Sequence, residues 1–339
     1  GEVMSIASTF TESLTKAIRS LEIGKTGIRN IDNRFINLPK NQLQEEIKTP
    51  RPRRIFAILE AIRRNWPIED IASLSKVDLW FLREIEKSFN VNPESTPVSI
   101  LKMLGWTDED LDSKEIKDDL ENKRAYKLVD TCSAEFLSKT PYLYSTFGTS
   151  DDDSASKNKK VVVIGSGPNR IGQGIEFDYC CVHGVESLKE NNYEAIMINS
   201  NPETVSTDYD TADKLYFEPL SWDEVKAVLA REKPDSVIIQ LGGQTPLKLA
   251  DKISSAGYKI AGSSLDVIDA TEDRDLFQKL CLSLNIDQPK SKISFNEDEL
   301  ISAVKEITYP VLLRPSYVLG GRAMRVVKND DELKNYLSI

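Results

Sequence analysis

The chain has 339 residues, of which 40% are hydrophobic and 29% are charged, and its formal net charge at pH 7 is −10. This composition is typical of a globular protein with two or three domains, and the acidic balance argues against a general nucleic-acid binder, because neutralising phosphates requires a basic surface. We expect no membrane span and no signal peptide, since no apolar run has the required length. The four cysteines include an adjacent pair, which is not a disulfide framework, so the sequence predicts a cytoplasmic protein.

Residues 1–152 are predicted to form an all-α domain. Thr9 and Glu12 have the spacing of a capping box, and apolar residues recur at helical intervals after it. The strongly charged segment 108–127 is expected to be a solvated helix or loop. A polar stretch of small and charged residues, 149–160, marks the predicted end of this domain. The predicted helices are 10–21, 52–65 and 76–89.

Residues 158–272 alternate between short apolar runs and amphipathic segments. This pattern predicts a parallel sheet with helical crossovers, that is, a Rossmann-like α/β domain. Ser221 and Glu224 have the spacing of a second capping box at the start of one helix. The predicted strands are 161–165, 195–199, 235–240 and 258–262, and the predicted helices are 174–190, 221–233 and 245–257.

Residues 273–339 are predicted to begin a third domain. Its final stretch, DDELKNYLSI, has a helical pattern that breaks off, so we expect this domain to be truncated. The predicted helices are 273–284 and 297–307, and the predicted strands are 292–295, 310–316 and 320–327.

The stretch VVVIGSGPNR begins like a dinucleotide-binding turn, with an apolar strand followed by Gly165 and Gly167. Arg170 stands where the fingerprint has its third glycine, and the second strand ends in Asn199 where an acidic residue would hold a ribose hydroxyl. These departures leave NAD or FAD binding as a weak alternative. The other interpretation is a tight turn whose glycines let a helix approach a strand closely.

Polar side chains follow three neighbouring strands of the predicted sheet. Glu176 and Glu203 come after the first two strands, and Gln244 comes after the next. Ligands bind at the carboxyl ends of strands in open α/β sheets. We therefore expect Glu176 and Glu203 to face each other across a crevice, with ordinary loop carboxylates as the alternative.

Cys180, Cys181 and His183 have the residue types of a metal site or a catalytic Cys–His pair. A structural zinc site needs four ligands and the chain has one histidine, so buried thiols in a packed helix are the preferred interpretation.

Residues 67–85 have the rhythm of a helix-turn-helix, although helix pairs of this kind are common in all-α domains. Arginines that would suit DNA or a protein interface lie just upstream: Arg51, Arg53, Arg54, Arg63 and Arg64.

Arg314 precedes a glycine pair, Gly320 and Gly321, between two predicted strands. A fixed guanidinium beside a glycine loop suits a nucleoside triphosphate, because its fork binds phosphate oxygens bidentately. A salt bridge beside a hairpin turn explains the same residues equally well.

Long motifs in this order resemble the large subunit of carbamoyl phosphate synthetases. The motifs are GSGPNRIGQGIEFDYCCVH, NPETVSTDYDTADKLYFEPL, QLGGQTPLKLA, TEDRDLF and RPSYVLGGRAM, and PRPRRIFAILEAIRR and VDTCSAEF resemble that subunit's oligomerization domain. The resemblance covers the whole chain. It implies an internal fragment with a helical oligomerization domain at 1–152, a pre-ATP-grasp domain at 158–272 and the start of an ATP-grasp domain at 273–339.

The resemblance implies ATP-dependent synthesis of carbamoyl phosphate from bicarbonate, ammonia from glutamine and two ATP, in which this half phosphorylates carbamate. Gly174, Glu176 and Glu203 match positions that line the family's carbamate tunnel. Arg274 and Arg314 match arginines that contact ATP, and Gly320 and Gly321 match the loop over the phosphates.

No catalytic residue or metal ligand is expected within the chain, so the fragment alone is predicted to be inactive. The family implies ATP with Mg²⁺ or Mn²⁺, and K⁺, as cofactors, and a glutaminase small subunit and self-association through the helical domain as partners. An assembly scaffold is the alternative for the isolated chain, whereas NPETVSTDYD argues against a biotin-carboxylase-like ligase.

Overall fold

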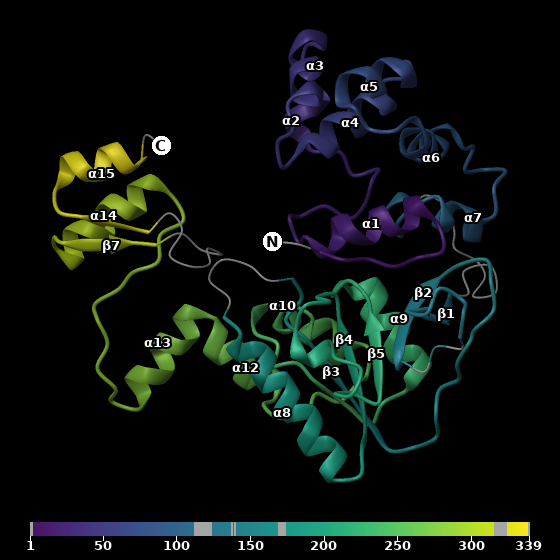
Figure 1. Cartoon of the computed structure of the whole chain (residues 1–339). Helices are drawn as coiled ribbons and strands as arrows, with labels where there is room; N and C mark the ends of the chain where they lie inside the picture. Colours follow the sequence, from purple (N-terminus) through teal and green to yellow (C-terminus); the bar gives the residue numbers. More distant parts are fainter. Residues whose placement is uncertain are drawn as a thin grey trace. The chain divides into compact units, whose positions relative to one another are not determined.

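A computed structural model describes residues 3–111, 124–136, 138, 140–168, 174–314 and 324–337. The chain divides into two compact units, one formed by Gly1–Asn169 with Glu176–Ala261 and the other by Arg170–Ile175 with Gly262–Ile339 (Figure 1). The first unit holds helices followed by a mixed α/β sheet, and the second holds helices with a small hairpin.

The amino-terminal part of the first unit is helical, as predicted. Its main core is a cluster of aliphatic and aromatic side chains in which Phe56, Leu59, Ile71 and Leu82 are fully or almost fully buried, and α7 and η1 contribute to a smaller separate cluster. The three predicted helices are confirmed as α1, α4 and α6. The helices are α1 (Phe10–Ser20), α2 (Asn33–Ile36), α3 (Lys40–Lys48), α4 (Arg54–Arg63), α5 (Ile68–Ser75), α6 (Leu79–Asn90) and α7 (Val98–Met103), followed by the 3₁₀ turn η1 (Glu109–Leu111).

Most of the arginines noted in the sequence are paired within this helical part. The buried Glu60 carboxylate accepts hydrogen bonds from Arg63 and Arg64 at 2.7 Å. Arg64 also donates to two backbone carbonyls at the end of α2 and to that of Leu38 after it, and Arg53 donates to Asp32 at 2.7 Å. These guanidiniums therefore hold the helices together.

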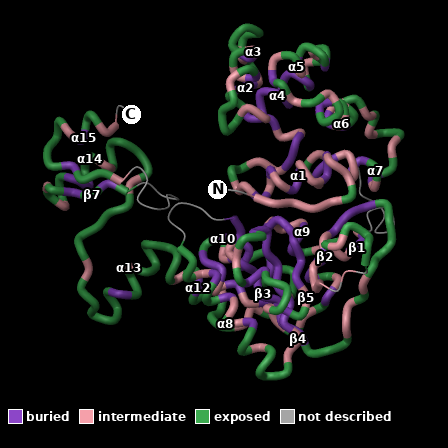
Figure 2. Tube along the Cα trace, viewed as in Figure 1, coloured by how far each residue is buried: buried purple, intermediate pink, exposed green. Residues whose placement is uncertain are grey.

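The sheet of the first unit has six strands in the order β1-β2-β5-β4-β3-β6. All neighbouring strands are parallel except β1 and β2, which are antiparallel. The parallel α/β sheet is therefore confirmed, and its centre is buried (Figure 2). The strands are β1 (Ala125–Leu128), β2 (Tyr142–Thr146), β3 (Lys160–Ile164), β4 (Glu194–Asn199), β5 (Lys214–Phe217) and β6 (Ser236–Ile238).

The helical prediction is wrong for the last part of residues 1–152. Strands β1 and β2 lie in that range, and β2 pairs with β5 of the α/β sheet. Each strand is short and follows a charged or polar stretch. Its alternation of apolar and polar residues is therefore too brief to distinguish a strand from a loop. Pairing with a distant strand decides the conformation.

The predicted strand at 258–262 is present only as a single bridge between Val237 and Ile260. Helices pack on the sheet. Val163, Met197 and Leu215 from three strands contact Cys181 and Val185 of α8 in one buried cluster. The helices are α8 (Glu176–Glu190), α9 (Trp222–Glu232), α10 (Gln244–Leu247) and α11 (Ala250–Ser255), and a 3₁₀ turn, η2, spans Val205–Thr207.

In its described residues, the second unit contains a two-stranded antiparallel hairpin and four helices. Val304, Val311, Leu313, Val327 and Leu333 form its buried cluster. The elements are α12 (Leu265–Glu272), α13 (Arg274–Ser283), α14 (Glu297–Ile307), β7 (Val311–Leu313), β8 (Arg325–Val327) and α15 (Asp330–Leu337).

One strand predicted in the second unit is absent, because residues 292–295 have no regular structure. Phe295 in this segment is 90% exposed, so no neighbour stabilises an extended conformation.

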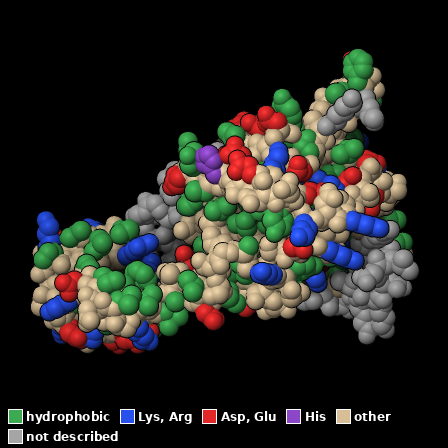
Figure 3. Space-filling view, turned by 90° about the horizontal axis from the view of Figure 1, so that it is seen from below, with side chains coloured by type: hydrophobic (Ala, Val, Ile, Leu, Met, Phe, Trp, Pro, Cys, Tyr) green, Lys and Arg blue, Asp and Glu red, His purple; other side chains and the backbone are tan. Residues whose placement is uncertain are grey.

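Figure 3 shows hydrophobic side chains on the surface of this unit, at the left. Those of α13 include Leu276, Phe277 and Leu280.

None of the helices in the described ranges combines the length and the apolar character that crossing a membrane requires.

Candidate functional site

The glycine turn after β3 is filled by a side chain of the protein itself. Asn199, the last residue of β4, is fully buried, and its Oδ1 accepts hydrogen bonds from the N–H groups of Gly167 at 3.1 Å and Ser200 at 2.9 Å. A Cβ on Gly165 would lie 2.6 Å from the Asn199 carboxamide. The glycine at 165 is therefore required by the close approach of Asn199.

The strand order β5-β4-β3-β6 places a topological switch point between β3 and β6, where doubly wound proteins bind nucleotides. Here Gly242, after β6, packs so closely that a Cβ on it would lie 2.5 Å from the carbonyl oxygen of Gly165. Gly243 has a φ of +73°, and the ring of Phe177 packs over it. Backbone and side chains therefore pack closely against the glycine turn, as the tight-turn interpretation predicts.

The loops that carry Glu176 and Glu203 meet at the carboxyl edge of the sheet. Asp178, in the first turn of α8, accepts a hydrogen bond from the N–H of Ser206 at 3.2 Å. Ser206 Oγ in turn accepts from Asn199 Nδ2 at 3.3 Å. One chain of hydrogen bonds thus connects the glycine turn, the loop after β4 and the start of α8.

Three buried polar atoms beside this junction have no hydrogen-bond partner among the residues that the structure describes. They are Asp178 Oδ1, Ser200 Oγ and Asn201 Nδ2, and each residue is at most 9% exposed. Buried polar groups are normally satisfied, so these atoms are available to water or to a polar ligand. The set includes donors and an acceptor.

The cysteine–histidine cluster is divided between two faces of α8. Cys181 lies in the buried core, whereas Cys180 is exposed and His183 pairs with Glu186 at 2.9 Å. Within the described ranges, no group of three or more His, Cys, Asp or Glu side chains is arranged to hold a metal ion. The prediction of buried thiols in a packed helix is therefore confirmed for Cys181 and wrong for Cys180.

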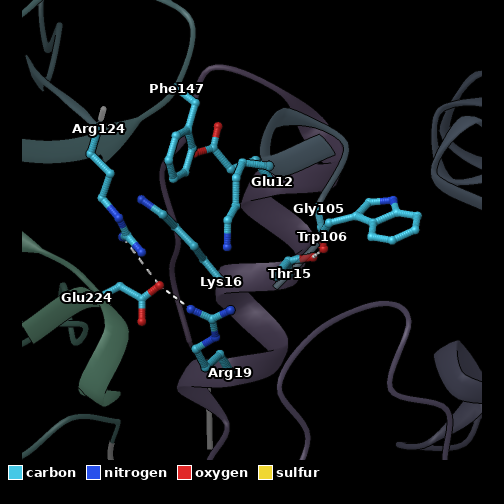
Figure 4. A pocket seen from close by; sticks show the side chains of 10 residues that line it. Glu12, Thr15, Lys16, Arg19, Gly105, Trp106, Arg124, Phe147 and Glu224 are labelled. Atoms are coloured by element: carbon cyan, nitrogen blue, oxygen red, sulfur yellow. Dashed lines mark hydrogen bonds and ion pairs between the residues drawn. The ribbon is translucent and has the colours of Figure 1, made fainter. Parts of the chain in front are cut away.

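A second cluster of functional groups, which the sequence analysis missed, lies between α1 and the sheet (Figure 4). Glu224, at the start of α9, is paired with Arg19 of α1 and lies 3.6 Å from Arg124 Nη1. Lys16 donates to Glu218 at 3.1 Å, and these two side chains are almost completely buried. Lys16, Arg19, Arg124 and Glu224 are among the residues that line a cavity of about 20 Å³, room for about one water molecule.

Burial raises the carboxyl pKa values in this cluster, and the neighbouring positive charges lower them. Burial raises the pKa of the Glu12 carboxyl from 4.5 to about 7, against the attraction of Lys16. Burial alone also raises the pKa of Glu224, but the guanidiniums of Arg19 and Arg124 outweigh it and lower that pKa to about 2. Glu224 is therefore ionised at neutral pH, whereas Glu12 is close to its midpoint.

The two capping boxes explain why the sequence analysis missed this cluster. Thr9 caps α1 by accepting from the N–H of Glu12 at 3.3 Å, but the Glu12 carboxylate accepts from Thr146 of β2 instead of returning to Thr9. At α9, the Ser221 hydroxyl makes no cap and donates to Glu224. Both helix starts are confirmed, but the reciprocal capping bond is wrong at both. The local sequence pattern does not show that these carboxylates become buried against residues far away in the chain.

Three family models match successive parts of the chain. The carbamoyl-phosphate synthetase large chain oligomerisation domain matches residues 2–113, and the carbamoyl phosphate synthase preATP-grasp domain matches residues 157–270. The carbamoyl-phosphate synthase L chain ATP binding domain matches residues 273–339. The chain belongs to the carbamoyl phosphate synthase large-chain family.

Relatives in this family align with nearly the whole chain. The carbamoyl phosphate synthase large chain of Archaeoglobus fulgidus is 44% identical over 361 residues, covering 100% of this chain and 34% of the relative. That of Pseudomonas aeruginosa is 43% identical over 361 residues, covering 99% of this chain and 33% of the relative. The chain therefore spans about a third of the length of these curated relatives. A solved Rhizobium etli pyruvate carboxylase is similar at a TM-score of 0.37 and 17% identity, covering 52% of this chain and 16% of that one, which is too low to bear on the fold.

The residues matched to synthase functions are all exposed where they are described. Glu176 begins α8, Glu203 lies in the loop after β4 and Gly174 precedes α8. Arg274 is the first residue of α13, and Arg314 follows β7. Gly320 and Gly321 lie outside the described residues. The tunnel and ATP assignments remain predictions.

Proposed function

We propose that this chain is the part of a carbamoyl phosphate synthetase large chain that receives carbamate and begins the site that phosphorylates it. The whole enzyme would make carbamoyl phosphate from bicarbonate, ammonia released from glutamine and two ATP. In this chain the carboxyl edge of the sheet, with Gly174, Glu176 and Glu203, would line the passage for carbamate.

The hydrogen-bonded junction at that edge carries the proposal. The bond between Asp178 and Ser206 brings the loop with Glu203 against the first turn of α8, which begins at Glu176. Both glutamates are exposed, and unpartnered polar atoms lie in the same loops. Carboxylates accept hydrogen bonds from a carbamate N–H₂ group and exchange protons with its acid form. The edge therefore suits transport of a small polar acid.

In the second unit, Arg274 and Arg314 are proposed to contact ATP. Both guanidiniums are exposed, and phosphoryl transfer depends on positioning and charge neutralisation. When bound, Mg²⁺ or Mn²⁺ would neutralise the triphosphate, with K⁺ as a further ion, and we place their ligands outside this chain. The proposed partners are the glutaminase small subunit and further copies of the chain.

Replacing Glu203 or Glu176 with glutamine in the full-length large chain, assembled with its small subunit, is expected to lower carbamoyl phosphate synthesis at least roughly tenfold, because proton exchange is lost. Bicarbonate-dependent ATP hydrolysis in the other half should continue, so more ADP forms per carbamoyl phosphate. Both products are measured in one assay. Glu186→Gln, an exposed carboxylate on α8, is the matched control. An unchanged ratio in both glutamine variants would overturn the proposed passage.

The helical part offers a surface for the proposed self-association. Trp80 and Phe81 on α6 are 54% and 41% exposed, and their rings pack with Phe10 at centroid distances of 5.8 and 4.9 Å. Exposed aromatic side chains are enriched in protein interfaces. Trp80→Ser is expected to weaken dimerisation by about tenfold or more, measured by light scattering across a concentration series. Exposed Tyr209→Ser is the control, and equal effects of both variants would contradict this surface.

A further inference from the structure

Asn199 connects three of the elements at the carboxyl edge of the sheet. Its Oδ1 holds the N–H of Gly167 in the turn after β3, and its Nδ2 donates to Ser206 in the loop after β4. Ser206 then donates its own N–H to Asp178 on α8. Asn199 and Ser206 are both fully buried, so solvent does not compete for these bonds.

Gly165 leaves the space that the Asn199 side chain occupies. A Cβ at Gly165 would lie 2.6 Å from Asn199 Cγ and Nδ2, which is too close for the two to coexist without movement. The carboxamide fills the space beside Gly165, and both of its ends are hydrogen-bonded. Buried hydrogen bonds of this kind are stronger than exposed ones and make the structure around them more rigid.

We propose that Asn199 is a positioning residue that fixes the loop bearing Glu203 relative to the helix start bearing Glu176. The inference rests on the proposed function, since the two glutamates matter only if carbamate passes between them. Asn199 acts through the loops and does not touch carbamate itself. Its role is to keep the passage closed to bulk water while carbamate moves.

The test uses the full-length large chain with its small subunit, carrying Asn199→Ala. The expected result is a rise of at least about twofold in ADP formed per carbamoyl phosphate, because misplaced walls let carbamate escape and hydrolyse. Two partial reactions serve as the discriminating readout: bicarbonate-dependent ATP hydrolysis, and ATP formation from ADP and carbamoyl phosphate. Each uses only one end of the passage, so both should keep their rates. Exposed Asn191→Ala is the matched control.

Gly165→Ala provides a second, independent arm. Alone it should raise the same ratio, since its Cβ displaces Asn199. Combined with Asn199→Ala it should add less than it does alone, because the two closest atoms, Asn199 Cγ and Nδ2, are then removed and only the Cβ at 3.0 Å remains. If Asn199→Ala does not fold, Ser206→Ala removes only one bond of the junction and should raise the ratio in the same direction.

The outcomes separate the two levels of inference. If the glutamine variants of Glu176 and Glu203 raise the ratio but Asn199→Ala and Ser206→Ala leave it unchanged, the positioning role is wrong and the passage stands. If Asn199→Ala lowers both partial reactions equally with no change in the ratio, Asn199 is only structural and the inference is overturned. If no variant changes the ratio, the proposed function itself fails. Strictly additive effects of the Gly165 and Asn199 variants would also contradict the positioning role.

Discussion

Replacing Glu224 with glutamine is expected to destabilise the chain by about 3–5 kcal/mol, because breaking a buried ion pair leaves uncompensated charge. Glu224 is 2% exposed, and its removal strands the guanidiniums of Arg19 and Arg124, whose side chains are 10% and 15% exposed. Glutamine keeps the size of the side chain, so the loss reports charge and not a cavity. The measurement is the free energy of unfolding from urea titration.

The matched control for Glu224 is an exposed ion pair in the same unit. Glu69 and Arg83 are 3.4 Å apart, and both side chains are more than half exposed. Glu69→Gln should cost less than about 1 kcal/mol, as solvent screens the pair. Similar losses in the two variants would show that burial does not set the strength of the Glu224 cluster.

Replacing Glu12 with glutamine is expected to stabilise the chain at pH 8 by up to about 3 kcal/mol and to have little effect near pH 4.5. The pKa of Glu12 rises from 4.5 to about 7 on folding, chiefly through burial. A raised carboxyl pKa contributes stability that is complete below about pH 4.5 and is lost as the pH rises through about 7. Glutamine removes this penalty because it stays neutral.

The groups that face Glu12 set the size of this effect. Lys16 on α1 and Arg124 before β1 favour the ionised form, as does the hydrogen bond from Thr146, whereas Glu218 after β5 opposes it. Urea unfolding of both proteins from pH 4.5 to 8.5 gives the difference in stability directly. If the difference in unfolding free energy between the two proteins is the same at every pH in this range, the pKa of Glu12 does not rise on folding.

Local sequence patterns predicted most of the secondary structure in this protein. The apolar spacing after Thr9 and the alternation of strands and helices after residue 158 are confirmed by α1 and by the parallel sheet. These patterns succeed because helix periodicity and capping involve residues at most four positions apart. Strands β1 and β2 were missed because a short strand is stabilised by the strands that it pairs with more than by its own residues.

The candidate site could be predicted only in part. The sequence placed Glu176 and Glu203 after two neighbouring strands at one edge of the sheet, and the bond between Asp178 and Ser206 joins the helix start and the loop that carry them. The carboxamide of Asn199 in the glycine turn could not be foreseen, since an asparagine after a strand has many possible partners. Its burial against Gly165 depends on the register of β3 and β4.

By itself, then, the sequence determined the helix starts, the strand–helix alternation, the glycine turn and, through its long motifs, the resemblance to carbamoyl phosphate synthetases. Only the tertiary structure decided how Glu12 and Glu224 are used. The bond from Thr146 to Glu12 spans 134 residues, and the bond from Arg19 to Glu224 spans 205. A capping pattern extends over one helical turn, whereas these partners meet only when α1 packs on the sheet and removes their carboxylates from water.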